Sequence, residues 1–85
     1  MDARMLDGNA VAGLLREVFA VEMTTATGTC NRCGASEHIG AVRVFLGAGA
    51  VLRCPRCDNA LVKIVKSDKR LWISLPGVQS LEVPT

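Results

Sequence analysis

The sequence is poor in aromatic residues, which limits the kind of core it can build. Among 85 residues there are two phenylalanines, one tryptophan and no tyrosine, although 49% of the residues are hydrophobic. The apolar mass is therefore mostly aliphatic. A chain of this length buries only about 60 to 65% of the surface that its unfolded form exposes, so its core alone gives marginal stability. We expect a single small globular domain, residues 1–85, with an additional source of stability.

Several kinds of functional segment are also missing. The opening residues 1–7 lack the basic and apolar regions of a secretory signal. The longest uncharged apolar stretch, 44–52, is far shorter than the about 20 residues that a membrane span requires. There is no Ser-His-Asp arrangement, no pair of carboxylates and no glycine-rich phosphate loop. These absences predict a soluble cytoplasmic protein that is not an enzyme, binds no small-molecule substrate and enters no membrane.

Four cysteines carry the most specific signal in the chain. They form two C-x2-C pairs separated by twenty residues: Cys30, Cys33, Cys54 and Cys57. In an intracellular protein this pattern indicates a tetrahedral metal site rather than disulfides. Four thiolates at about 2.3 Å from one Zn²⁺ leave no open coordination position, so the metal would be structural. With four thiolates and one zinc ion counted, the formal net charge of +2 falls to near zero.

Each cysteine pair has the sequence of a zinc knuckle, a tight turn that directs two sulfurs to one metal. The two copies read CNRCG and CPRCDN. In such a turn, backbone N–H groups just past the first cysteine donate to its thiolate. The chain then needs a residue with positive φ, for which Gly34 stands in the first copy and Asp58 or Asn59 in the second.

Three alternatives for the cysteines stay open. A site of four sulfurs also accepts iron, which would make the protein a rubredoxin-like electron carrier. We favour zinc because rubredoxin-like chains are acidic and rich in aromatic residues around the metal. Oxidation of the pairs to disulfides, with release of zinc, is the second alternative. His38 could replace one cysteine, but we expect it at the surface because four cysteines already complete the set.

The rest of the chain predicts one helix followed by antiparallel strands. Apolar residues recur at helical spacing within 6–22, and Asp7 is the candidate N-cap. A hairpin follows, with a strand from His38 to Leu46, a turn at Gly47–Gly49 and a return strand, so that one cysteine pair stands at each base. Later strands are expected at 60–66, 70–75 and, within the tail 76–85, at 78–83. The predicted fold is a small α+β zinc ribbon, with an N-terminal amphipathic helix packed on an antiparallel sheet of about four to five strands.

These residues resemble the zinc-ribbon superfamily, in which two C-x2-C knuckles stand on a β-hairpin that is followed by more antiparallel strand. The match runs from Cys30 to about Leu75, so the zinc-ribbon part of the domain is expected at 28–75. It implies a structural zinc without implying one function, since members bind DNA, RNA or proteins or serve as structural modules of larger assemblies. The whole chain, from LDGNA near its start to LEVP near its end, also resembles a family of short actinobacterial proteins of unknown function. That second resemblance implies a bacterial cytoplasmic origin and supplies no activity.

Two binding functions are compatible with the composition. Excess aliphatic residues on both faces of the strands at 60–66 and 70–75 predict a surface that a protein partner or a second copy covers. A homodimer or an accessory subunit of a larger protein is therefore our first expectation. Nucleic-acid binding is the alternative, through basic side chains and one aromatic: Arg53, Arg56, Lys63, Lys66, Lys69, Arg70 and Trp72. Lys63 and Lys66 are expected on opposite faces of their strand, which would divide this surface.

Overall fold

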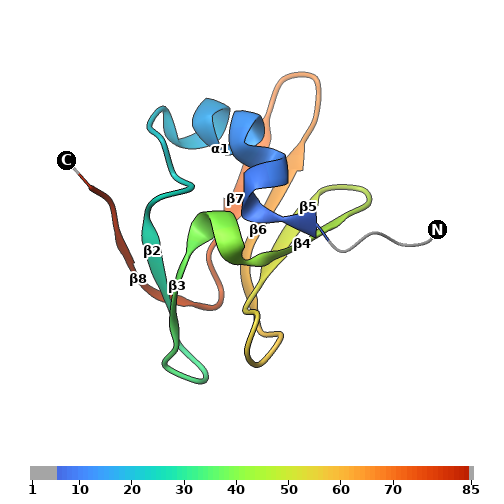
Figure 1. Cartoon of the computed structure of the whole chain (residues 1–85). Helices are drawn as coiled ribbons and strands as arrows, with labels where there is room; N and C mark the ends of the chain where they lie inside the picture. Colours follow the sequence, from blue (N-terminus) through green and yellow to red (C-terminus); the bar gives the residue numbers. More distant parts are fainter. Residues whose placement is uncertain (1–5, 85) are drawn as a thin grey trace.

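The computed structural model describes residues 6–84 and consists of two antiparallel β-sheets and one α-helix (Figure 1). The larger sheet has five strands in the order β1-β4-β5-β6-β7. These are β1 (Leu6–Asp7), β4 (Arg43–Leu46), β5 (Ala50–Arg53), β6 (Ala60–Lys66) and β7 (Leu71–Ser74). The smaller sheet has three strands in the order β3-β2-β8. These are β3 (Ser36–His38), β2 (Thr27–Cys30) and β8 (Val78–Glu82). The α+β class is as predicted, but the strands divide between two sheets.

The N-terminal helix is shorter than the predicted 6–22. Leu6 and Asp7 pair with β4, a 3₁₀ turn η1 (Gly8–Val11) follows, and α1 spans Ala12–Phe19. Asp7 precedes the 3₁₀ turn without capping it, because its side chain makes no cap hydrogen bond. The helix ends where Ala20 adopts a left-handed conformation, with φ of 62°, and donates its N–H to the Arg16 carbonyl. Local pairing at one end and a left-handed residue at the other thus set its length.

The helix is amphipathic as the spacing predicted. Leu15 and Val11 are buried, and Leu14, Val18 and Phe19 pack against the same cluster. That cluster is the core of the molecule and contains aliphatic residues and two cysteines but no aromatic side chain. Its buried members are Val11, Leu15, Met23, Ala26, Cys30, Ile39, Val42, Val44, Ala50, Leu52, Cys54, Leu61, Val62 and Ile64.

The predicted hairpin with a cysteine pair at each base is wrong in its first half. His38 ends β3, and a 3₁₀ turn η2 (Ile39–Ala41) separates it from β4. This segment turns because Ile39 donates its N–H to the Ala26 carbonyl at 2.8 Å and Gly40 donates to the Thr24 carbonyl at 2.9 Å. The first cysteine pair therefore lies at the β2–β3 connection of the small sheet, and the second at the β5–β6 connection of the large sheet.

The later strands match the sequence prediction more closely. β6 has the predicted bounds, and β7 lies within 70–75. A turn at Pro76 and Gly77 then leads into β8, which pairs with β2 rather than with β7. The tail therefore joins the small sheet and leaves β7 at the end of the large one. Within residues 6–84, no helix has the length and apolar character that crossing a bilayer requires.

Candidate metal centre

The two cysteine turns have the same backbone geometry. In the first, the Cys30 N–H donates to the Ala35 carbonyl at 2.9 Å, and the Gly34 N–H donates back to the Cys30 carbonyl at 3.0 Å. In the second, Cys54 donates to the Asn59 carbonyl at 2.8 Å, and Asp58 donates to the Cys54 carbonyl at 2.9 Å. Each donor and acceptor occupies the same place relative to its first cysteine. The sequence motif is therefore reproduced as a repeated structural unit.

A positive φ follows each second cysteine, as the motif predicted. Gly34 has φ of 78°, and Asp58, rather than Asn59, has φ of 65° at the equivalent position. Only glycine adopts this region without steric cost, although aspartate tolerates it better than most residues. The turn geometry thus explains why a glycine and an aspartate close the two loops.

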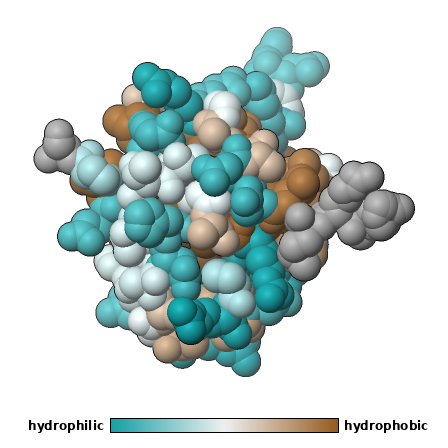
Figure 2. Space-filling model, in the orientation of Figure 1, coloured by the Kyte–Doolittle hydropathy of each residue, from teal (hydrophilic) through white to brown (hydrophobic). Residues whose placement is uncertain are grey.

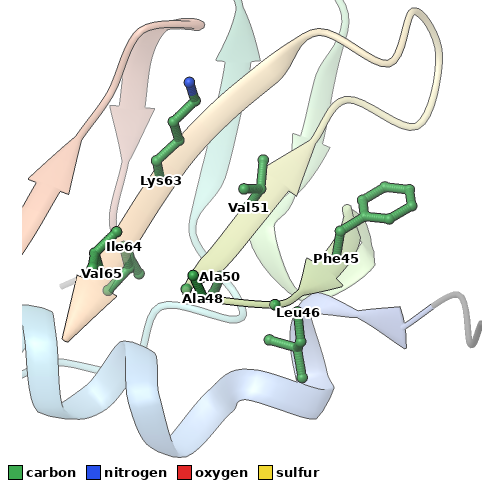
Figure 3. A pocket seen from close by; sticks show the side chains of 10 residues that line it. Phe45, Leu46, Ala48, Ala50, Val51, Lys63, Ile64 and Val65 are labelled. Atoms are coloured by element: carbon green, nitrogen blue, oxygen red, sulfur yellow. The ribbon is translucent and has the colours of Figure 1, made fainter. Parts of the chain in front are cut away.

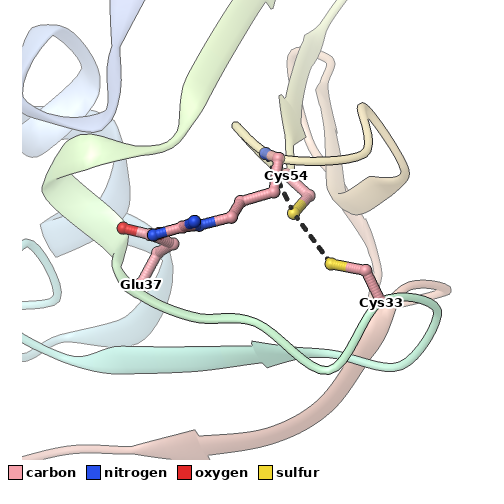
Figure 4. A network of polar contacts seen from close by, with 4 residues as sticks. Cys33, Glu37 and Cys54 are labelled. Carbon is pink, nitrogen blue, oxygen red and sulfur yellow. Dashed lines mark hydrogen bonds and ion pairs between the residues drawn. The ribbon is translucent and has the colours of Figure 1, made fainter.

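The four sulfurs gather at the point where the two turns face each other. The Sγ atoms of Cys30 and Cys57 are 3.6 Å apart, and those of Cys33 and Cys54 are 3.7 Å apart. Figure 4 shows Cys33 and Cys54 reaching toward each other from separate hairpins. All four ligand atoms lie within 4.8 Å of one another. Sulfurs at the corners of a tetrahedron around Zn²⁺ would be about 3.8 Å apart, so the spacing suits a metal held by four thiolates.

Hydrogen bonds to sulfur match the charge that a thiolate carries. The backbone N–H of Arg32 donates to the Cys30 sulfur, and that of Arg56 donates to the Cys54 sulfur, each at 3.4 Å. The side-chain amide of Asn59 also donates to Cys30, at 3.6 Å. These donors stabilise the deprotonated form that binds a metal ion.

Four thiols this close do not ionise alike. Hydrogen bonds from the backbone of Cys33, from the backbone of Arg32 and from the Asn59 side chain lower the pKa of Cys30 from 9.0 to about 6. The backbone N–H of Asn59 lowers the pKa of Cys57, but burial and the three neighbouring sulfurs outweigh it and raise that pKa to about 12. A bound cation would offset the repulsion between neighbouring thiolates, so that all four cysteines could be deprotonated at once.

An asparagine pair connects the centre to the end of the large sheet. The Asn59 amide donates to the side-chain carbonyl of Asn31 at 3.2 Å, and the Asn31 amide donates to the Pro76 carbonyl at 2.9 Å. The Asn31 backbone N–H also donates to the Gly77 carbonyl at 2.8 Å. The motif prediction missed this arrangement, since residues so distant in sequence meet only in the folded chain. It positions the first cysteine turn against both the second turn and the β7–β8 connection.

The cysteines differ in their access to solvent. The first cysteine of each pair, Cys30 and Cys54, is buried, whereas Cys33 is exposed and Cys57 is half-buried. His38 is exposed at the end of β3 and is not a member of the cluster. The centre therefore joins the hydrophobic core on one side and reaches the surface on the other.

Three of the basic residues proposed for nucleic-acid binding form ion pairs. Arg53 pairs with Asp58 at 3.4 Å, and its guanidinium lies 5.3 Å from the centre of the Phe45 ring. Arg56 reaches Glu37 at 3.0 Å, which raises the pKa of Arg56. The third pair, Lys66 with Glu17 at 2.8 Å, connects β6 to α1.

The remaining proposed residues lie in two places. Lys63 is on the face of β6 opposite to Lys66, as strand alternation predicted, and pairs with Ser74 of β7. Lys69 and Arg70 occupy the β6–β7 turn next to Trp72, which is exposed. The structure thus places Trp72 near two of the six basic residues.

Comparison with known proteins identifies a family but no characterised relative. The chain belongs to the Family of unknown function (DUF6510), whose model matches residues 1–85. No curated protein and no solved structure matches it. The function is therefore argued from the site itself.

Proposed function

We propose that this member of the DUF6510 family is a non-enzymatic interaction module held together by one structural Zn²⁺ on four thiolates. The observation that carries the proposal is the convergence of Cys30, Cys33, Cys54 and Cys57 within 4.8 Å, from hairpins that belong to different sheets. When bound, the metal would cross-link the two sheets at this point. Four protein ligands complete a tetrahedral zinc site, and such closed sites contribute folding energy rather than catalysis.

The small core supports a structural rather than a catalytic metal. The core contains no aromatic side chain, and two of its buried members are cysteines of the cluster. A domain of this size commonly requires a metal or a disulfide in addition to its core. Apparent binding energies of about 10 to 16 kcal/mol at structural zinc sites are as large as the whole net stability of a typical domain, about 5 to 15 kcal/mol. We therefore propose that the folded state depends on the metal, in the manner of a zinc ribbon.

Iron is the alternative metal, because the same four thiolates accept it. The two differ in colour, since iron bound by four thiolates absorbs visible light and zinc does not. An ultraviolet-visible spectrum of protein purified without added metal separates them. A colourless protein with one zinc per chain supports the proposal, and a coloured protein with one iron per chain supports electron transfer instead.

The interaction part of the proposal rests on exposed apolar side chains of the large sheet. On one face, Phe45, Val51 and Lys63 lie side by side on neighbouring strands (Figure 3). Beside the turn at 47–49 they border a shallow groove of about 380 Å³. The face of the molecule seen in Figure 2 is mostly hydrophilic or neutral, with smaller hydrophobic patches. The large exposed apolar residues are Val21, Phe45, Leu46, Val65, Leu71, Trp72, Ile73 and Leu75, and most of them belong to the large sheet. They occupy both faces of that sheet, and exposed apolar surface of this kind supports an interface.

Nucleic-acid binding stays the second prediction, with less support. Three of its six basic residues are neutralised by carboxylates, and Lys63 and Lys66 lie on opposite faces. The salt dependence of binding distinguishes nucleic-acid binding from protein interaction. Binding to a polyanion weakens steeply as ionic strength rises, whereas binding through apolar contacts does not. Titration of a single-stranded oligonucleotide, followed by Trp72 fluorescence at two salt concentrations, tests it directly.

A further inference from the structure

Strand β7 presents an open backbone edge. It is the last strand of the large sheet, and all four of its residues are exposed. Ser67 donates its N–H to the Arg70 carbonyl at 2.9 Å where the β6–β7 hairpin closes. Because hydrogen-bonded and non-hydrogen-bonded pairs alternate along an antiparallel ladder, Leu71 and Ile73 direct their backbone N–H and C=O groups away from β6. Among the described residues, no other strand pairs with this edge.

This edge lacks the features that usually prevent strand pairing. Edge strands are commonly protected by charged residues, proline or a bulge, and Leu71–Ser74 has none of these. Its apolar residues also occupy both faces, with Leu71 and Ile73 on one and Trp72 on the other. They are 38%, 41% and 53% exposed. A helix or a flat surface would cover one face only, whereas an added strand extends both. A β-strand therefore suits this edge better than a helix or a flat surface does.

We propose that β7 pairs antiparallel with β7 of a second copy, across a two-fold axis at Trp72. This inference rests on the proposed interaction function and names its partner. The axis places Trp72 opposite Trp72 at a non-hydrogen-bonded pair, where cross-strand side chains are closest. Leu71 then faces Ile73 of the other copy, and the outward N–H and C=O groups of both residues are satisfied. The contact is isologous, as expected of a closed dimer.

The charge distribution fits a second copy. The strand itself is uncharged, and the charges nearest to it along the chain, Asp68, Lys69 and Arg70, all precede it. Lys63 and Lys66 belong to β6, which lies on the side of β7 away from the proposed partner. Antiparallel pairing sends the two charged turns to opposite ends of the interface. Arg70 of one copy then lies beside Ser74 of the other, so no like charges meet directly. A parallel arrangement would bring the two basic turns together and is disfavoured for that reason.

The first test measures the mass of the zinc-loaded protein in solution by sedimentation over a range of concentrations. We expect a dimer for the wild type. Ile73→Pro removes the outward N–H of the edge without removing a bond to β6, so it should raise the dimer dissociation constant by at least roughly tenfold. The control Leu46→Lys removes a large exposed apolar side chain at the end of β4 and should leave the dimer unchanged.

A charge-swap pair tests the register independently of any effect of proline on folding. Trp72→Lys and Trp72→Glu each place like charges opposite one another, so each variant alone should be monomeric at concentrations where the wild type is dimeric. An equimolar mixture of the two should recover the dimer. A monomeric wild type, or two monomeric variants that remain monomeric when mixed, overturns the proposal.

Metal content measured on the same samples separates this inference from the function on which it rests. A monomer with one zinc per chain would refute the dimer and leave the metal proposal standing. A wild type that folds without metal would refute the metal proposal whatever its mass.

Discussion

The sulfur of Cys30 lies 3.6 Å from that of Cys57, although the two residues are 27 positions apart in the sequence. Each first cysteine lies close to the second cysteine of the other turn, and Cys33 and Cys54 repeat the relationship at 3.7 Å. Both short sulfur–sulfur distances are therefore between the two turns and not within one turn. Neither turn can move away without separating both pairs, so the centre couples the small sheet to the large one.

Replacing one exposed cysteine should abolish the centre. Cys33→Ser leaves three thiolates, and we expect it to lose bound zinc and to unfold or aggregate, because the remaining sulfurs no longer complete the site. Metal analysis and circular dichroism check this. Arg32→Ala in the same turn is the matched control, since it keeps the backbone N–H that donates to Cys30 and should retain zinc. A Cys33→Ser protein with the metal content and melting behaviour of the wild type contradicts the four-thiolate assignment.

Removing the Asn59 side chain should weaken zinc binding without abolishing it. Asn59→Ala deletes the donor to the Cys30 sulfur and the bond to Asn31, and groups in this position typically change metal affinity by about 10- to 100-fold. Competition with a chromophoric chelator measures the affinity. Gln79→Ala removes an exposed amide from β8 and serves as the control. Equal affinities for the two variants would show that the amide does not support the thiolate.

The number of protons released on zinc binding should show whether the metal-free chain is folded. We expect the chelator-treated chain to be unfolded, so the hydrogen bonds that lower the pKa of Cys30 to about 6 in the fold are absent and its thiol returns toward 9.0. All four thiols are then protonated at pH 7, and zinc binding should release about four protons, with the apparent affinity falling by about tenfold per pH unit for each proton released. Calorimetry in buffers of different ionisation enthalpy counts the protons. A count of about three at pH 7 that rises to four below pH 6 would show a folded metal-free chain with Cys30 already ionised, and would contradict metal-dependent folding.

Two glycine substitutions should change stability in opposite directions. Gly34→Ala forces a side chain into a residue with φ of 78° and should cost about 1–2 kcal/mol. Gly13→Ala lies within α1, where an added Cβ meets nothing within 4 Å, and should stabilise the protein by about 0.5–1 kcal/mol. Denaturant unfolding at saturating zinc measures both. If Gly34→Ala unfolds at the wild-type midpoint, the conformation assigned to the first turn is wrong.

The cysteine turns could be predicted from the sequence because their geometry is local. The spacing within each pair and the residue that follows it, Gly34 or Asp58, are determined over about five positions. β6 was also predictable, since its run of aliphatic residues has few alternatives. The course of the chain around His38 was not, because Ile39 and Gly40 each donate one backbone hydrogen bond to the loop at 20–26, which is distant in the sequence. The need for glycine at position 8 could not be predicted for the same reason, since the backbone of Gly8 packs against the carbonyl of the distant Ile39 and leaves no room for a Cβ.

The division of the strands into two sheets could not be predicted from the sequence either. Whether β8 would pair with β7 or with β2 depends on the direction in which the chain leaves the turn at Pro76 and Gly77. Local pattern carries no information on that choice. Because β8 pairs with β2, the edge of β7 stays without a neighbouring strand and Trp72 is exposed. The clustering of the four cysteines could thus be predicted from spacing, whereas the candidate interface required the fold.

Native mass spectrometry of protein purified without added metal is the decisive test of a structural zinc on four thiolates, since it counts bound metal per chain in one experiment. We predict one zinc per chain, and unfolding when a chelator removes it. A folded chain without metal, or one whose mass shows that the four cysteines have lost their protons to form two disulfides, would contradict the account.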